Sequence, residues 1–339
     1  MKFGLWYHLR NPARWAQRWD RLYAATLQQI EAAETLGYSS VWTSEHHFTE
    51  DGYLPSSLLF LAAAAQRTRR MRLGTLILLL PLHHPLRVAE DAAVLDVISG
   101  GRLDLGVAAG YRVPEFEAFG VPHKERGRRM DDALAILQGA WGDGAFSFRG
   151  DYYRVEHLNV TPKPLQRPGP PIWMGGQSKA AIRRAARFGC HLLPSSTTDF
   201  DLVTTYHDAL REHGRDPSRF RIKCFRPLYC CEDARRGWDD VKEHMLYQHN
   251  LYRRWYRDAG DSQAPDLDDP SELPRDSYIV GTPDDCERAI RNLRRELPFE
   301  EFVFWAYPPG FSVERSMRSL ELFARKVIPR FREAGPPAS

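Results

Sequence analysis

Short apolar stretches alternate with amphipathic stretches along most of the chain. The apolar stretches have the length and flanking turn residues of strands buried on both faces, and the stretches between them have the spacing of helices. The predicted strands lie at 2–9, 39–45, 71–81, 102–110, 170–176, 190–196, 220–231 and 299–309. The predicted helices lie at 18–36, 56–69, 85–99, 124–141, 178–189, 199–213, 233–257 and 312–333. Alternating strands and helices predict a parallel sheet.

Eight strand–helix pairs on 339 residues favour a closed (β/α)8 barrel of the α/β class over a doubly wound sheet. The whole chain, 1–339, is therefore expected to form one barrel domain. Two segments interrupt the alternation. Residues 143–171 predict a hairpin followed by a proline-rich crossing, and residues 257–276 predict a mobile lid loop near the barrel mouth, with simple disorder as the alternative.

Composition restricts the partners of this barrel. A hydrophobic fraction of 43% suits a large core, and a net charge of +3 does not favour nucleic acid. The basic run at 67–72 is interpreted as an exposed helix end. The longest apolar run, 73–82, is about half the length of a membrane span. We therefore expect neither nucleic acid nor membrane as a partner.

The cysteines and glycines argue against two further classes of protein: those held together by disulfides and those with a dinucleotide-binding domain. Five cysteines without a CxxC pair are typical of reduced thiols in the cytoplasm rather than of a disulfide framework. No G-x-G-x-x-G sequence occurs, which argues against a dinucleotide-binding domain.

The sequence "SEHHF" follows the second predicted strand, and barrel chemistry is located at such carboxyl ends. Neighbouring side chains on a strand point to opposite sides, so His46 and His47 would not both face the axis. This argues against a metal site, since a barrel metal site favours His-x-His, and metal binding stays open only as the less favoured alternative. An imidazole at a partly desolvated mouth suits proton transfer, which we assign to His46, with Glu45 orienting one ring. For His47, His83 and His84, ligand contact, capping and packing stay equally open.

A second signal is the sequence "IWMGGQSKAAIRR". A strand ends at Gly175 and Gly176, and Ser178 stands at a helix start followed by Lys179. Glycines permit close backbone approach, and the free N–H groups of a helix start attract an anion. The alternative is an ordinary turn with a serine cap.

With these residues in hand, the chain resembles the bacterial luciferase-like flavin monooxygenase family. The resemblance covers nearly the whole length and is carried by "VWTSEHHFTE", "LPLHHPLRVAEDAAVLDVISGGRLDLG", "EFEAFG" and "VGTPDDC". It implies a (β/α)8 barrel that binds reduced FMN at the strand ends and uses O2 to oxidise a small organic substrate. It also implies a homodimer, for which the helices at 56–69 and 85–99 are the candidate interface, and a separate flavin reductase that supplies the FMN.

The resemblance also implies roles for individual residues. His46 matches the catalytic histidine, and a non-prolyl cis peptide is expected at Leu76–Ile77 beneath the flavin ring. The residues matched to cofactor binding are Thr75, Leu76, Ile77, Gly110, Gly176, Gln177 and Ser178.

The chain departs from the family where Ala108 and Ala109 replace a cysteine and a phosphate-binding arginine before Gly110. We therefore do not expect light emission, and whether Arg112 replaces the arginine stays open. Ala181 also replaces a hydroxyl residue.

The substrate pocket is expected to be aromatic and mainly apolar, because several aromatic residues lie at or near strand ends; core packing of several of them is the alternative. No cluster of arginine or lysine points to a sulfonate or phosphate substrate. The candidate residues of the pocket are Trp6, Tyr7, His8, Glu45, Tyr111, Trp305 and Tyr307. Two other functions stay open. One is hydride transfer with coenzyme F420, although "EHHFTE" favours FMN, and the other is flavin binding without turnover.

Overall fold

A computed structural model describes residues 1–176, 178–194, 200–260 and 262–332. Its centre is a parallel sheet with the strand order β10-β13-β1-β2-β3-β5-β8-β9. A backbone bridge from Leu192 to Ile222 joins the two ends of this order and closes the barrel. The barrel strands are β1 (Lys2–Tyr7), β2 (Ser40–Thr43), β3 (Arg72–Thr75), β4 (Leu78–Leu79), β5 (Leu103–Ala108), β8 (Ile172–Gly175), β9 (His191–Leu193), β10 (Lys223–Arg226) and β13 (Glu301–Trp305). The predicted (β/α)8 barrel is confirmed.

The barrel interior is filled with side chains. Trp42 and Trp173 meet edge to face inside it, with ring centroids 6.2 Å apart. A Cβ added at Gly74 would lie 2.2 Å from the Trp42 ring, so glycine is required there for the indole to fit. The buried Lys223 ammonium lies 4.2 Å and 4.3 Å from the Trp42 and Trp173 rings. The interior is therefore a packed core, and any site must lie at one of its two ends.

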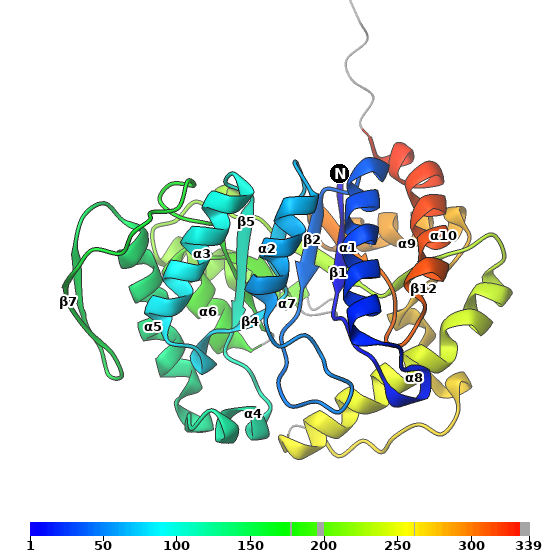
Figure 1. Cartoon of the computed structure of the whole chain (residues 1–339), viewed down its shortest axis with the longest axis horizontal. Coiled ribbons are helices and arrows are strands. Elements are labelled where there is room, and N and C mark those ends of the chain that lie inside the picture. Colours follow the sequence, from blue (N-terminus) through cyan, green and yellow to red (C-terminus); the bar gives the residue numbers. More distant parts are fainter. Residues whose placement is uncertain (177, 195–199, 261, 333–339) are drawn as a thin grey trace, which may run out of the picture.

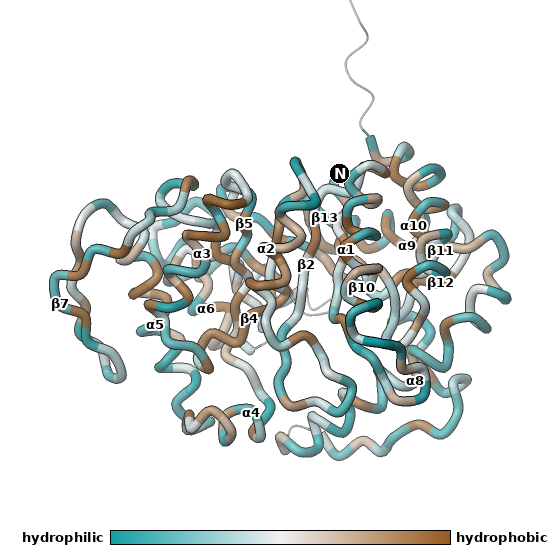
Figure 2. Tube along the Cα trace, in the orientation of Figure 1, coloured by the Kyte–Doolittle hydropathy of each residue, from teal (hydrophilic) through white to brown (hydrophobic). Residues whose placement is uncertain are grey.

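Helices surround this core (Figure 1). Hydrophobic residues, coloured brown in Figure 2, are concentrated in the central strands and in the helices around them. Local signals set several helix ends: Pro85 opens α3, which Gly100 ends in the left-handed conformation, and Thr282 with Asp285 forms a capping box at α9. The helices are α1 (Trp19–Leu36), α2 (Ser57–Arg67), α3 (Pro85–Ser99), α4 (Val113–Ala118), α5 (Arg126–Trp141), α6 (Lys179–Phe188), α7 (Phe200–Glu212), α8 (Ala234–Asp258), α9 (Pro283–Glu296) and α10 (Val313–Lys326). Among the described residues, no helix is long and apolar enough to cross a membrane.

Two predicted strands are wrong in their bounds. The segment 71–81 breaks into β3, β4 and a 3-10 turn, with a cis peptide at Leu76–Ile77 that confirms the bond expected from the resemblance. The segment 220–231 divides at Pro227, which has no N–H to donate. Its second half, β11 (Leu228–Cys230), pairs with β12 (Ile279–Gly281) in a separate sheet. The strand β12 and the helix α9 after it were absent from the predicted alternation.

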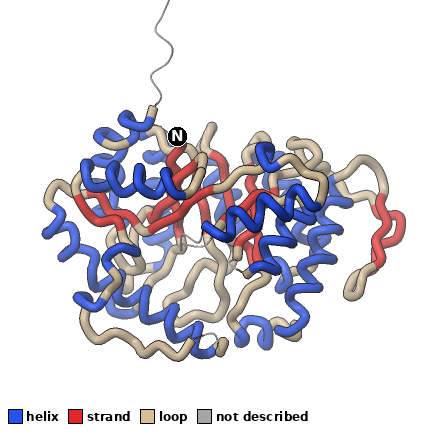
Figure 3. Tube along the Cα trace, turned by 180° about the vertical axis from the view of Figure 1, so that it is seen from behind, coloured by secondary structure: helices blue, strands red, loops and turns tan. Residues whose placement is uncertain are grey.

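The two insertions lie outside the barrel wall. Residues 143–171 contain the predicted hairpin, formed by β6 (Phe146–Arg149) and β7 (Arg154–Leu158), which projects to one side (Figure 1). The described part of 257–276 runs along α8, where Asn250 exchanges two hydrogen bonds of 2.8 Å with Leu267. Seen from behind, α8 and several long loops lie at the end of the barrel opposite the amino terminus (Figure 3).

Candidate functional site

The carboxyl ends of β1 and β2 lead into a buried loop that places the first candidate residues. The loop after β2 returns to β1, where the Leu54 N–H donates to the His8 carbonyl at 3.1 Å. The His46 N–H donates to the Leu54 carbonyl at 3.3 Å. These bonds hold His46 at the mouth of the barrel, where 7% of its surface is exposed.

His46 is oriented by a carboxylate from another element. Its Nδ1 lies 2.9 Å from Oε1 of Glu115, a fully buried residue in the first turn of α4. The same oxygen accepts from the His47 N–H at 2.9 Å and from Arg112 Nη1 at 2.8 Å. Sequence reasoning assigned no role to Glu115, although it lies within the quoted motif "EFEAFG".

These contacts fix the charge states of the pair. Burial on its own raises the pKa of Glu115, but the hydrogen bonds from His46 and the His47 N–H, together with the Arg112 charge, outweigh it and hold that pKa below the usual range. Burial lowers the pKa of His46, and Glu115 opposes this only in part. An ionised Glu115 can only accept, so Nδ1 of a neutral His46 carries the proton and Nε2 is left as the base.

Aromatic rings enclose His46. Tyr53 and Trp255 lie with ring centroids 4.8 Å from it, and Tyr111 lies 5.9 Å away. Trp255 comes from α8, and its ring also carries the Arg112 guanidinium at 4.3 Å. The carboxyl half of α8 therefore covers most of the histidine surface.

A buried cation lies in the same aromatic enclosure. The Arg10 side chain is fully buried, and its Nε donates to Asp51 Oδ2 at 2.5 Å. Its Nη1 donates to Gln248 of α8. Its guanidinium carbon lies 5.2 Å from the Tyr53 ring and 5.8 Å from the Trp255 ring. Sequence reasoning did not name Arg10 among the candidate residues.

Glu45 orients His47 rather than His46. Oε1 of the buried Glu45 lies 2.7 Å from Nε2 of His47 and 2.7 Å from Nε2 of His83. Both distances suit hydrogen bonds, although these three groups are also close enough to hold one metal ion. The preference against a metal therefore stays a prediction. His84 takes no part in this cluster and packs on Tyr153, with ring centroids 5.5 Å apart.

The segment matched to the flavin ring lies beside the glycine turn. Thr75 is buried and donates its hydroxyl to the Gly106 carbonyl at 2.6 Å. The Leu76 N–H donates to the Thr43 carbonyl, also at 2.6 Å. A Cβ added at Gly175 would lie 2.7 Å from Ile77 Cδ1, so the ends of β3 and β8 meet at Ile77.

The glycine turn forms a cradle at the start of α6. Gly176 has a φ of 131°, which favours glycine, and an added Cβ would lie 2.9 Å from the Ala181 Cβ. Ser178 caps the helix by accepting from the Ala181 N–H at 3.2 Å. The backbone amides of Lys179 and Ala180 precede the helical hydrogen-bond ladder and can receive an anion. These residues fit the phosphate of FMN, while Gln177 lies outside the described residues.

The segment that departs from the family also lies at this mouth. Gly110 has a φ of 77°, and an added Cβ would lie 3.0 Å from the Phe116 ring. Arg112, for which a phosphate-binding role was left open, instead bonds Glu115 and the His47 carbonyl, at 2.8 Å and 3.0 Å.

The expected aromatic pocket divides into two groups. Trp6 and Trp305 have ring centroids 5.7 Å apart, and His8 lies 5.9 Å from Trp305. Tyr7 and Tyr307 pack on each other instead, and the Tyr307 hydroxyl lies 2.8 Å from Thr26 of α1. Because α1 lies outside the barrel, the contacts of the two tyrosines match core packing, the alternative left open for the aromatic candidates.

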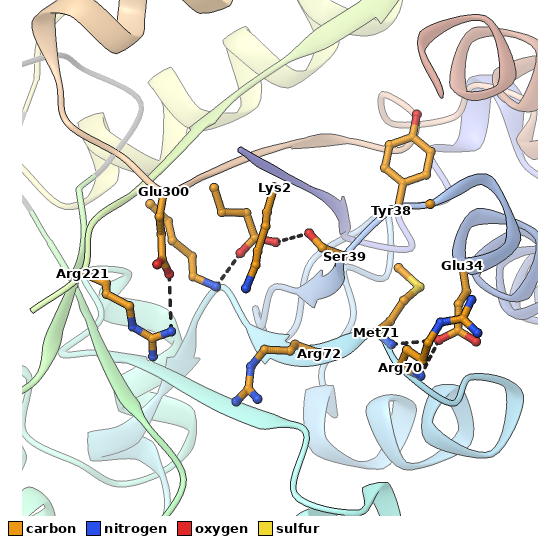
Figure 4. Close-up of a pocket in the computed structure, with 12 residues that line it drawn as sticks. Lys2, Glu34, Tyr38, Ser39, Arg70, Met71, Arg72, Arg221 and Glu300 are labelled. Atoms are coloured by element: carbon orange, nitrogen blue, oxygen red, sulfur yellow. Dashed lines mark hydrogen bonds and ion pairs between the residues drawn. The ribbon is translucent and has the colours of Figure 1, made fainter. Parts of the chain in front are cut away.

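A separate cavity of about 320 Å³ lies at the opposite, amino-terminal end of the strands (Figure 4). Its buried charges are already paired. Lys223 Nζ lies 2.5 Å from Glu301, which also accepts from Ser39 at 2.6 Å. The partly exposed Arg221 lies 3.4 Å from Glu300. Because this end of a barrel contributes stability rather than chemistry, the candidate site is the carboxyl end.

Comparison with known proteins identifies the family of this chain. Residues 1–301 match the family model described as luciferase-like monooxygenase. The chain is 26% identical to the oxygenase component of the flavin-dependent trigonelline monooxygenase of Acinetobacter baylyi, over 98% of this chain and 96% of that protein.

Two solved structures share the fold. The monooxygenase RslO1 from Streptomyces bottropensis superposes with a TM-score of 0.84 and 28% identity, over 98% of this chain and 100% of that one. The oxygenating constituent of 3,6-diketocamphane monooxygenase from Pseudomonas putida, solved with FMN, superposes with a TM-score of 0.80 and 22% identity, over 97% and 98% of the two chains. The chain therefore belongs to the luciferase-like monooxygenase family.

Proposed function

We propose that this protein is a flavin-dependent monooxygenase that uses reduced FMN and O2 to oxidise a small organic substrate. The observation that carries the proposal is the pairing of His46 with Glu115 at 2.9 Å, at the same barrel end as the glycine cradle before α6. A polarised imidazole at the same barrel end as an anion-binding turn suits proton transfer to or from a bound phosphate-containing cofactor.

Each group of residues at the barrel mouth would have its own role in the reaction. Gly176, Ser178 and the first amides of α6 would hold the FMN phosphate, and Leu76–Ile77 would lie against the flavin ring. Bound reduced FMN would supply the electrons that activate O2. His46 would take or give a proton at Nε2 while Glu115 keeps Nδ1 protonated.

Neighbouring elements would exclude water from the reacting groups. Trp255 and Tyr252 of α8 cover His46, with Tyr252 6.3 Å from its ring. The segment 257–276, which follows α8, would open this cover as a lid. Its described residues are tied to α8 by polar bonds, such as that from Arg257 to the Ala264 carbonyl at 2.6 Å, which a modest motion could break.

The proposal extends to a partner protein and to the cellular location. A separate reductase would supply reduced FMN, since the sequence has no dinucleotide fingerprint of its own. The five free cysteines suit the cytoplasm.

We also propose a homodimer formed through α2 and α3. Four apolar side chains on these two helices face solvent in the single chain. Leu59 is 74% exposed, and Val94, Val97 and Ile98 are 41–44% exposed. A second copy would cover this surface, as expected for adjacent exposed apolar side chains.

The test is oxygen consumption with supplied reduced FMN across aldehydes, ketones and aromatic compounds, with mass spectrometry of the products. We expect one oxygen atom from O2 in the product of at least one compound. A parallel reaction with reduced coenzyme F420 should give no turnover. Turnover with F420 alone would replace the proposal with hydride transfer, and flavin binding without turnover of any compound would leave only a binding protein.

A further inference from the structure

Three side chains that can ligate a metal converge at the barrel mouth. Oε1 of Glu45 lies 2.7 Å from Nε2 of His47 and 2.7 Å from Nε2 of His83, and all three atoms lie within 4.8 Å of one another. A tetrahedral zinc ion holds its nitrogen and oxygen ligands about 3.3 Å apart, so shifts of about 1 Å or less would seat an ion here. Among the described residues, no other group of three histidine, cysteine, aspartate or glutamate side chains converges in this way.

Two loops of the mouth bring the group together. Glu45 and His47 follow β2 two positions apart, the spacing that places side chains on the same side of an extended chain. His83 ends the 3-10 turn after β4, where its N–H donates to the Leu80 carbonyl at 3.1 Å. The preference against a metal rested on the spacing of histidines alone. It took account neither of a carboxylate ligand nor of a ligand from another loop.

The group is closed on one side and open on the other. The Glu45 and His47 side chains are 1% and 9% exposed, whereas the His83 side chain is 31% exposed. The rings of Phe48 and Phe119 pack on His47, with centroids 5.8 Å and 4.8 Å from it. An ion would therefore enter from the His83 side and bind against an apolar wall, which limits the access of competing water.

Hydrogen bonding leaves part of the Glu45 carboxylate unused. Both imidazoles meet the same oxygen, Oε1. Among the described residues, the donor that reaches Oε2 is the Leu79 N–H at 3.4 Å, a long distance for a hydrogen bond. An ionised carboxylate has about four acceptor sites, so Glu45 keeps the capacity to bind a cation.

The ligand types favour one class of ion. Two imidazoles and one carboxylate form the ligand set of some catalytic zinc sites and of the facial site of non-haem iron(II). Mg²⁺ and Ca²⁺ prefer oxygen ligands alone. We propose that Glu45, His47 and His83 bind one divalent transition-metal ion, for which Zn²⁺ is the probe. Each ring would turn an unprotonated Nε2 to the ion, with its proton on Nδ1.

The ion would lie next to the proposed proton-transfer pair. The His47 N–H donates to Oε1 of Glu115 at 2.9 Å, and the same oxygen lies 2.9 Å from Nδ1 of His46. A metal held by His47 would therefore also fix the backbone that helps to position Glu115. The metal site does not depend on the proposed function, because its test needs neither flavin nor substrate.

The first experiment titrates Zn²⁺ into flavin-free protein that has been stripped of metal with a chelator and desalted. Competition with a chromogenic zinc indicator should give one Zn²⁺ per chain with a Kd of about 10 µM or tighter, because the ligands are already assembled in the fold. An excess of Mg²⁺ should not displace it. In a zinc-soaked crystal, an anomalous difference map should place the ion between the three side chains. Weaker binding, displacement by Mg²⁺ or an ion bound elsewhere would overturn the proposal.

Substitutions separate these ligands from a chance histidine site. Glu45→Gln keeps the shape of the side chain and removes its charge, and His83→Asn removes an imidazole at a partly exposed position. The control is His84→Asn, the same change at the next residue, whose ring packs on Tyr153 outside the group. Zn²⁺ affinity should fall by at least about 10-fold in Glu45→Gln and in His83→Asn, since even the partners of metal ligands contribute about 10- to 100-fold.

The control His84→Asn should keep the parent affinity for Zn²⁺. Circular dichroism of each variant reports loss of folding separately, and His83→Asn decides the question if Glu45→Gln does not fold. An unchanged affinity in His83→Asn, or an equal loss in His84→Asn, would overturn the proposal.

Discussion

Replacing Glu115 by glutamine tests how His46 is prepared for proton transfer. Oε1 of Glu115 accepts three hydrogen bonds of 2.8–2.9 Å, from His46, His47 and Arg112. A bond to a charged group is worth about 1 kcal/mol more than a neutral one, so Glu115→Gln should cost roughly 2–3 kcal/mol of folding stability. The amide can also donate to Nδ1, which would move the ring proton to Nε2 and remove the base.

We expect turnover in Glu115→Gln to fall by about 100-fold, at the lower end of general acid–base effects. Glu115 raises the pKa of His46 against burial, so the acid limb of the kcat/KM profile should move to lower pH in the variant. The assay measures oxygenated product formed per reduced FMN from pH 5 to 9. The control is Glu117→Gln, the same change at an exposed position of α4. An unmoved acid limb, or an equal loss in the control, would refute the reasoning.

Four further outcomes are expected. His46→Ala should lower turnover by about 10²–10⁴-fold; unchanged product formation would remove its role. Gly176→Ala should weaken FMN binding while affecting riboflavin less, because the φ of 131° and the Ala181 contact at 2.9 Å form a phosphate cradle; equal losses in a fluorescence titration would contradict this. Folded His191 has a pKa lowered from 6.5 to about 4 by burial and then by Arg221, so stability should fall as pH drops from about 6.5 to 4, and urea denaturation of His191→Asn should recover roughly 2–3 kcal/mol of that loss. Glutamate at both Leu59 and Val97 should convert a dimer to a monomer in light scattering; a monomeric parent protein would refute the proposed interface.

The fold was largely predictable because its signals are local. Strands buried on both faces read as continuous apolar runs, and residues such as Pro85 and Gly100 mark helix ends. The strand predictions failed where pairing with a distant strand decides which sheet a segment joins. Leu228 continues an apolar run, but Pro227 interrupts the strand and Leu228 pairs with Ile279 in a second sheet. No local pattern contains that partner.

The site was predictable only as a set of strand ends. The position of His46 after a strand located the mouth, and "GG" before a helix indicated an anion cradle. Glu115 lies 69 positions from His46 in the chain, and its role depends on how α4 folds back over the mouth. Arg10 and Trp255 come together only because α8 crosses that end. Contacts between distant segments carry no periodicity, so sequence reasoning missed them.

A crystal structure of the protein with FMN tests the central claim most directly. The account predicts the phosphate within hydrogen-bond distance of the amides at the start of α6, beside Gly176 and Ser178. It also predicts the ring system over Leu76–Ile77, with His46 at its edge. Flavin bound in the cavity at the amino-terminal end, or a phosphate held away from α6, would contradict it.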